Sequence, residues 1–126
     1  MSKKEFNQVK IGVLGGGQLG KMLLQEAYNY NLQVSVLDPS PDAPCCNIAP
    51  EFIVGDFKDF ETVYQFGRNK DIVTIEFEDV NTDALEKLES EGIKVFPQPS
   101  ALRTIQDKGL QKLFYQNHGI PTQKFE

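Results

Sequence analysis

Short apolar runs alternate along the chain with longer segments whose apolar residues recur at helical spacing. Apolar runs bounded by Gly, Pro or Asp are typical of strands buried in a parallel sheet. The pattern predicts strands at residues 9–14, 34–37, 51–54, 72–75 and 93–96. It predicts helices at 19–30, from Asp59 onward, from Asn81 or Thr82 to Gly92, at 99–104 and at 107–117. Prolines at 39, 41, 44 and 50 predict a loop between the second and third strands.

The alternation of strands and helices determines the expected fold class. Parallel strands in one sheet need crossover connections, and these crossovers are right-handed. We therefore predict a Rossmann-like, doubly wound α/β domain with a mainly parallel sheet of about five strands. The expected strand order begins 3-2-1-4, which places the fourth strand beside the first.

The helical segments also predict which side chains face the sheet. In the second and third helices the inward residues are expected to be Val63, Phe66, Leu85 and Leu88, with Phe60 as an additional candidate. The first helix is expected to bury one stripe formed by Leu19, Met22, Leu23, Ala27 and Tyr30.

Composition narrows the class of protein. The 126 residues include 40% hydrophobic residues and carry a formal net charge of −5. The size fits one domain with one core, and the acidic balance argues against sequence-independent nucleic-acid binding. No apolar run approaches the roughly 20 residues of a membrane helix. A disulfide between the adjacent Cys45 and Cys46 would be strained, so we expect reduced thiols and a cytoplasmic protein.

A glycine-rich loop follows the first predicted strand. Residues 15–20 read GGGQLG and satisfy G-x-G-x-x-G, a pattern that lets a phosphate approach the backbone at a helix N-terminus. Asp38 ends the second predicted strand, where dinucleotide enzymes place an acid for the adenosine ribose. These residues alone favour an NAD-binding domain of an oxidoreductase or sensor. The alternatives are a tight turn without a ligand and, for Asp38-Pro39, a turn that ends the strand.

An acidic segment, Glu76-Phe77-Glu78-Asp79, follows the fourth predicted strand. The carboxyl ends of the first and fourth strands meet at the topological switch point, where open α/β sheets bind ligands. A carboxylate there can accept hydrogen bonds from ribose hydroxyls; the alternative is a solvated turn that caps the next helix. Strand alternation predicts that Glu76 and Glu78 point one way and Phe77 the other.

The segment 106–108 (QDK) precedes the last predicted helix. Asp107 is a candidate helix cap, and Lys108 and Lys112 either reach a nucleotide phosphate or form a solvated face. No metal-ligand spacing is present in the sequence, so no metal residue is predicted.

Four blocks together resemble one enzyme family: GGGQLGKM at 15–22, VLDP at 36–39, TIEFEDV at 74–80 and QDKGLQK to GIPT at 106–122. The sequence is similar to the ATP-grasp ligase 5-(carboxyamino)imidazole ribonucleotide synthase, the ATPase subunit of phosphoribosylaminoimidazole carboxylase. The resemblance covers essentially the whole chain. It implies the N-terminal, pre-ATP-grasp domain of an enzyme that uses ATP, bicarbonate and magnesium to carboxylate 5-aminoimidazole ribonucleotide in purine biosynthesis.

The resemblance also implies residue roles. Substrate binding would fall to Gly16, Gly17, Gln18, Leu19 and Glu76, with Glu76 on the ribose hydroxyls. Lys108 would contact ATP in the place of an arginine, and this exchange keeps the charge but loses the planar fork.

Further implications concern domains and partners. Residues 1–105 would form the substrate-binding domain, and residues 106–126 a helix and the start of the connection to an ATP-grasp domain. No catalytic residue falls in this chain, so it is expected to be inactive alone and to bind ATP and magnesium only weakly. A homodimer is compatible with the resemblance.

Overall fold

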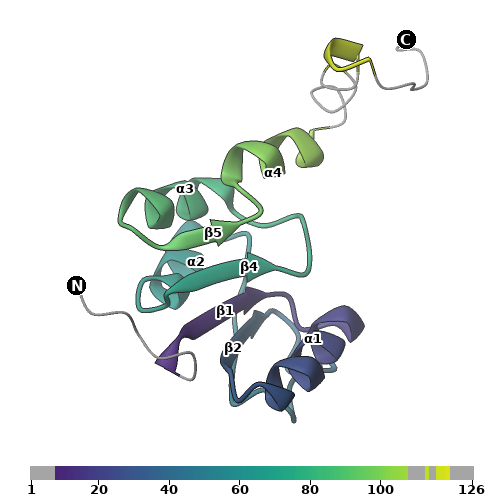
Figure 1. Cartoon of the computed structure of the whole chain (residues 1–126), viewed down its shortest axis with the longest axis vertical. Coiled ribbons are helices and arrows are strands. Elements are labelled where there is room, and N and C mark those ends of the chain that lie inside the picture. Colours follow the sequence, from purple (N-terminus) through teal and green to yellow (C-terminus); the bar gives the residue numbers. More distant parts are fainter. Residues whose placement is uncertain (1–7, 108–112, 114–115, 120–126) are drawn as a thin grey trace.

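The computed structural model describes residues 8–107, 113 and 116–119. Strands and helices alternate along the chain, except that a loop connects β2 to β3 (Figure 1). The strands are β1 (Lys10–Leu14), β2 (Gln33–Asp38), β3 (Glu51–Val54), β4 (Ile72–Ile75) and β5 (Lys94–Phe96). The helices are α1 (Gln18–Asn29), α2 (Phe60–Gly67), α3 (Thr82–Ser90) and α4 (Pro99–Gln106).

The sheet has five strands in the order β3-β2-β1-β4-β5, and every neighbouring pair is parallel. The predicted fold class is confirmed, including the position of β4 beside β1. Leu14 lies opposite both Leu37 and Ile75 in the strand register. The residues that leave β1, β2 and β4 therefore start from the same edge of the sheet, which is the edge predicted to bind a ligand.

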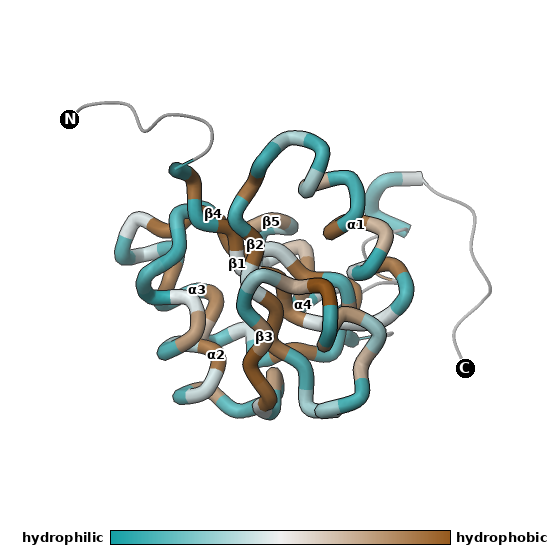
Figure 2. The backbone as a smooth tube through the Cα atoms, turned by 90° about the horizontal axis from the view of Figure 1, so that it is seen from below, coloured by the Kyte–Doolittle hydropathy of each residue, from teal (hydrophilic) through white to brown (hydrophobic). Residues whose placement is uncertain are grey.

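Two hydrophobic clusters lie on the two faces of the sheet. Side chains of α2, α3 and α4 pack on one face, in a cluster that includes Leu14, Leu37, Val63, Phe66, Val73, Leu85, Leu88 and Leu102. Helix α1 and the loop after β2 cover the other face, in a cluster of Val13, Leu24, Ala27, Val34, Val36 and Cys45. In Figure 2 hydrophobic residues are concentrated in the central strands and hydrophilic residues in the surrounding loops.

The buried face of α1 differs from the prediction. Leu19 and Met22 are 67% and 63% exposed, whereas the buried residues of the helix are Gly20, Leu24 and Ala27. A Cβ on Gly20 would lie only 3.0 Å from a backbone carbonyl oxygen of the glycine loop. This close approach turns Gly20 toward the sheet, so the buried stripe continues four and seven residues later.

Helix ends follow the sequence signals where the structure describes them. Asp59 caps α2 by accepting a hydrogen bond from Thr62 N, and Asn81 caps α3 by accepting one from Ala84 N. Gly92 follows α3 with a φ of +96°, a conformation that favours glycine. Asp107 is the C-terminal cap of α4 rather than the start of a helix. Most of the helix predicted at 107–117 lies outside the described residues.

Candidate functional site

The glycine loop leaves β1 through a turn that only glycine adopts easily. Gly15 has a φ of +109°, and its N–H donates to Leu37 O at 2.8 Å. Gly15 and Gly16 are buried, while Gly17 is half-buried and Gln18 and Leu19 are exposed. The loop therefore presents the start of α1, rather than its first two glycines, to solvent.

Asp38 holds this loop in place. One carboxylate oxygen accepts a hydrogen bond from Gly16 N at 2.7 Å, and the other accepts one from Ser40 N at 2.8 Å. The carboxylate thus connects the glycine loop to the turn after β2. This geometry corresponds to the turn interpretation of Asp-Pro, because both oxygens are already engaged by backbone N–H groups.

Glu76 lies over the glycine loop from the neighbouring strand. Its backbone N–H donates to Leu14 O at 2.8 Å, which fixes where the residue leaves β4. A Cβ on Gly15 would lie 2.6 Å from Glu76 Oε2, and a Cβ on Gly17 would lie 2.9 Å from Oε1. A side chain at either position would therefore displace the half-buried carboxylate from its place over the loop. The carboxylate makes no hydrogen bond or ion pair with another described residue, so its oxygens can accept from a ligand.

The N-terminus of α1 lies beside this carboxylate. Gly17 is the N-cap residue, no side chain caps the helix, and no acidic residue is in its first turn. The first N–H groups of a helix need acceptors and carry the positive end of the helix dipole. Donors from α1 and acceptor oxygens from Glu76 therefore meet at one surface, a combination suited to a ligand that carries both an anionic group and hydroxyls.

The buried residue Cys45 contacts the backbone of the glycine loop. Cys45 N donates to Gly16 O at 3.0 Å, and Cys45 Sγ lies 3.8 Å from Gly17 O. Burial raises the pKa of the Cys45 thiol, and the negative charges of Glu76 and Asp38 raise it further. Cys45 is therefore a neutral packing residue under the loop. Both cysteines are free thiols, as predicted.

The segment after β4 departs from strand alternation. Because β4 ends at Ile75, the predicted arrangement of Glu76 and Glu78 on one side does not apply. Glu76 turns onto the glycine loop and Glu78 is exposed. Phe77 packs on Phe57, with ring centroids 5.3 Å apart.

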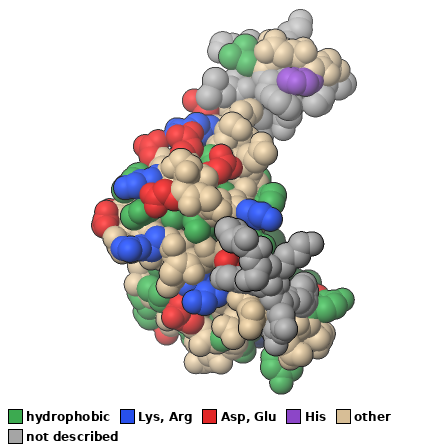
Figure 3. Space-filling model, turned by 60° about the vertical axis from the view of Figure 1, so that its left-hand side comes forward, with side chains coloured by type: hydrophobic (Ala, Val, Ile, Leu, Met, Phe, Trp, Pro, Cys, Tyr) green, Lys and Arg blue, Asp and Glu red, His purple; other side chains and the backbone are tan. Residues whose placement is uncertain are grey.

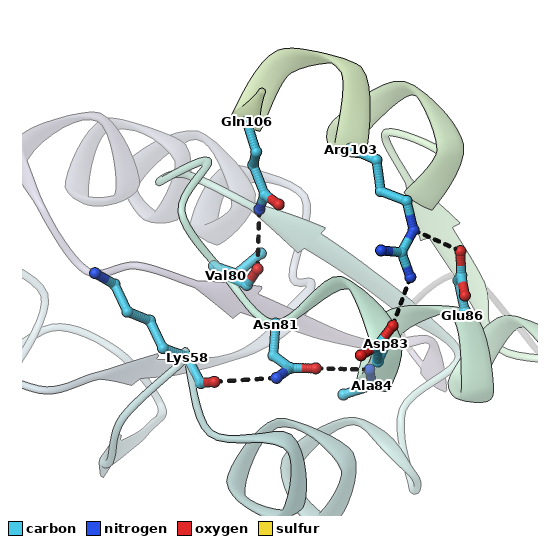
Figure 4. Close-up of polar contacts among 8 residues, drawn as sticks. All are labelled: Lys58, Val80, Asn81, Asp83, Ala84, Glu86, Arg103 and Gln106. Carbon is cyan, nitrogen blue, oxygen red and sulfur yellow. Dashed lines mark hydrogen bonds and ion pairs between the residues drawn. The ribbon is translucent and has the colours of Figure 1, made fainter. Parts of the chain in front are cut away.

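Helix α4 contacts this same segment, a connection that the sequence did not reveal. Gln106 Nε2 donates to Glu78 O at 2.7 Å and to Val80 O at 2.9 Å. Figure 4 shows Gln106 pointing from the end of α4 to Val80, while Arg103 on the same helix pairs with Asp83 and Glu86 of α3. The predicted ATP-binding residue Lys108 lies outside the described residues.

The charge distribution on one face of the described residues points to no second candidate surface there. On the face shown in Figure 3, acidic and basic side chains are interspersed and form no broad basic patch. Within the described part of the chain, no helix is long and apolar enough to cross a membrane. The same residues contain no group of three or more His, Cys, Asp or Glu side chains placed to hold a metal ion.

Comparison with known proteins identifies the family. A family model described as the ribonucleotide synthetase preATP-grasp domain matches residues 8–106, which include every described strand and helix from β1 to α4. The chain belongs to this family. The resemblance noted in the sequence is thus confirmed at the level of the domain.

Individual relatives of this preATP-grasp domain are longer proteins. Phosphoribosylaminoimidazole carboxylase, chloroplastic, from Vigna aconitifolia is 40% identical over 118 residues, which are 94% of this chain and 21% of that protein. N5-carboxyaminoimidazole ribonucleotide synthase from Staphylococcus haemolyticus is 36% identical over 90% of this chain and 31% of its own length. The chain therefore spans about a fifth to a third of the length of these relatives.

Solved structures agree with these relatives. Carboxyaminoimidazole ribonucleotide synthase from Aspergillus clavatus in complex with ATP has a TM-score of 0.88 and 43% identity, over 95% of this chain and 31% of that chain. A second structure from Aspergillus clavatus, in complex with ADP and 5-aminoimidazole ribonucleotide, has a TM-score of 0.86 and 43% identity, over 95% and 32%. The enzyme from Thermotoga maritima has a TM-score of 0.85 and 42% identity, over 93% and 32%.

Proposed function

We propose that this chain is the substrate-binding, pre-ATP-grasp part of an ATP-dependent ligase that carboxylates 5-aminoimidazole ribonucleotide with bicarbonate. The names of the relatives support this assignment, since they are N5-carboxyaminoimidazole ribonucleotide synthases and phosphoribosylaminoimidazole carboxylases. One of them is described in complex with ADP and 5-aminoimidazole ribonucleotide. The enzyme would act in the cytoplasm and use magnesium with ATP. Residues 1–105 would form the domain and residues 106–126 would lead to the ATP-grasp domain.

The observation that carries the proposal is the Glu76 carboxylate lying on Gly15 and Gly17 beside the uncapped start of α1. Ribose hydroxyls would donate to Glu76, and hydrogen bonds to an ionised acceptor are about twice as strong as neutral ones. The backbone of Gly16, Gly17, Gln18 and Leu19 would hold the phosphate or ribose side of the ribonucleotide. No catalytic group is assigned to this chain, which would bind and orient the substrate only.

The alternative of an NAD-binding domain is less well supported. A dinucleotide pyrophosphate would have to approach Gly17, where the Glu76 carboxylate lies 2.9 Å from a Cβ position. A diphosphate placed against this carboxylate would be repelled, and the repulsion between like charges is strong away from bulk water. Asp38, the expected acid for the adenosine ribose, already accepts from Gly16 N and Ser40 N. Both features favour a ligand that presents ribose hydroxyls to Glu76 and a single phosphate to the N–H groups at the start of α1, rather than a diphosphate lying against Glu76.

Isothermal titration of the chain with 5-aminoimidazole ribonucleotide, and in parallel with NADH, tests the proposal. Heat with the ribonucleotide alone is expected. Glu76→Gln should weaken binding about 10-fold to 100-fold, the effect of losing a hydrogen bond to a charged group. Glu78→Gln is the matched control, because Glu78 lies in the same segment but is exposed and should leave the affinity unchanged. Heat with NADH alone would contradict the proposal.

A further inference from the structure

The Glu76 carboxylate belongs to an irregular segment that lies between the end of β4 and Asn81, the N-cap residue of α3. The segment Glu76–Val80 connects β4 to α3. Its first two residues donate from their N–H groups to Leu14 O, at 2.8 and 3.4 Å. Within the segment, the described backbone hydrogen bond joins residues only two positions apart: Val80 N–H donates to Glu78 O at 3.0 Å. The position of the middle of the segment therefore depends on side-chain contacts. Phe77 packs on Phe57, Asp79 pairs with Lys58 at 2.7 Å, and Val80 is buried in the core.

Gln106 supplies such a contact with both of its side-chain hydrogens. A glutamine amide has two N–H donors on one nitrogen. Gln106 Nε2 lies 2.7 Å from Glu78 O and 2.9 Å from Val80 O, so each hydrogen has its own carbonyl. The amide thus joins two residues of the segment that are two positions apart, the nearer of them two positions from Glu76.

Helix α4 gives Gln106 a defined place (Figure 4). Pro99 and Leu102 of α4 are buried, and Arg103 pairs with Asp83 and Glu86 of α3. The helix is therefore packed on α3, and Gln106, its last residue, extends back over the segment after β4. Lys108, the predicted ATP-contacting residue, follows Gln106 by two positions in the sequence.

We infer that Gln106 is a positioning residue: its amide fixes the segment Glu76–Val80 and thereby holds the Glu76 carboxylate over the glycine loop. The geometry couples the C-terminal end of α4 to the candidate substrate site, so a movement at that end of the helix also moves Glu76. The expected effect of Gln106 on the conformation of the segment rests on its hydrogen bonds alone. The expected effect of Gln106 on the affinity for 5-aminoimidazole ribonucleotide rests on the proposed function.

The test compares Gln106→Met, Gln106→Lys and Arg103→Met with the unaltered chain. Methionine keeps the length of glutamine without its donors, lysine restores donors, and Arg103→Met removes the exposed ion pairs with Asp83 and Glu86 without touching the two carbonyls. Three readouts are needed: the amide NMR resonances of residues 76–80 without ligand, the Kd for 5-aminoimidazole ribonucleotide, and the Tm.

The inference predicts that Gln106→Met shifts the resonances of residues 76–80 and weakens binding about threefold to tenfold. Gln106→Lys should return those resonances toward the unaltered positions. Arg103→Met should leave the Tm nearly unchanged and the Kd within about twofold, since exposed ion pairs contribute little to stability. Unchanged resonances in Gln106→Met, or equal loss of affinity in Arg103→Met, would overturn the inference. If the unaltered chain binds no ribonucleotide, the proposed function fails and the resonances alone decide on Gln106.

Discussion

The first prediction concerns the contribution to stability of Asn81, which lies between the segment Glu76–Val80 and α3. Its side chain accepts a hydrogen bond from Ala84 N at 2.9 Å as the N-cap, and it donates to Lys58 O at 3.0 Å (Figure 4). Replacing an N-cap Asn by Ala costs about 1 kcal/mol. Losing the second hydrogen bond costs about 1 kcal/mol more. Asn81→Ala should therefore lower the free energy of unfolding by about 2 kcal/mol.

Urea denaturation followed by circular dichroism measures this loss, which corresponds to a fall in Tm of roughly 8 °C for a domain of this size. Asn81→Ser is the matched variant: it retains a capping oxygen but is too short to reach Lys58 O, so about half of the loss should remain. A loss below about 0.5 kcal/mol in Asn81→Ala would refute the reasoning. So would equal losses in the two variants, because the cap would then contribute nothing.

Three further predictions follow from single contacts. Gly20→Ala should destabilise the chain by about 1–3 kcal/mol in urea denaturation, because its Cβ would meet a backbone carbonyl at 3.0 Å and α1 would have to shift; a neutral effect would refute this close packing. Hydrogen bonds from Thr62 lower the pKa of Asp59 in the folded chain. The Asp59 cap therefore contributes its full stability above the pKa of the unfolded chain, about 3.9. This stability is lost as the pH falls through the lower pKa of the folded chain. The destabilisation caused by Asp59→Ala should accordingly shrink between about pH 7 and about pH 3, and a constant difference would contradict the assignment. A thiol reagent such as iodoacetamide should modify Cys46 first in the folded chain and Cys45 only after unfolding, because Cys45 is fully buried and burial raises its pKa; rapid modification of both would show that the loop opens.

The parts of the fold that depend on local pattern were predictable. The strand Ile72–Ile75 consists of β-branched residues and is bounded by polar residues. It pairs in a parallel sheet as that pattern indicates, with Val73 buried and the other three residues half-buried. The inner faces of α2 and α3 follow helical periodicity, with Val63, Leu85 and Leu88 fully buried. Which face of α1 is buried against the sheet could not be predicted in this way. Gly20 has no side chain and so does not appear in the hydrophobic pattern of the sequence. Its close approach to the backbone of the glycine loop nevertheless determines which residues of α1 face the sheet.

The candidate site shows the same limit. Position in the sequence placed Glu76 at the carboxyl end of β4, next to the glycine loop, because parallel strands end at a common edge. That the carboxylate lies on Gly15 and Gly17 depends on where β4 stops and how the chain bends afterwards, which involves residues distant in sequence. The contacts of Gln106 with Glu78 O and Val80 O could not be predicted from the sequence, since a glutamine at a helix end carries no pattern that indicates its partners.

The most direct test of the central claim is a crystal structure of the chain with 5-aminoimidazole ribonucleotide bound. The account predicts ribose hydroxyls within hydrogen-bond distance of the Glu76 carboxylate, about 3 Å, with the rest of the ligand at the start of α1. Ribonucleotide bound away from the glycine loop would contradict the account. So would a structure in which NADH places its pyrophosphate on Gly17 and Glu76 turns away from the loop.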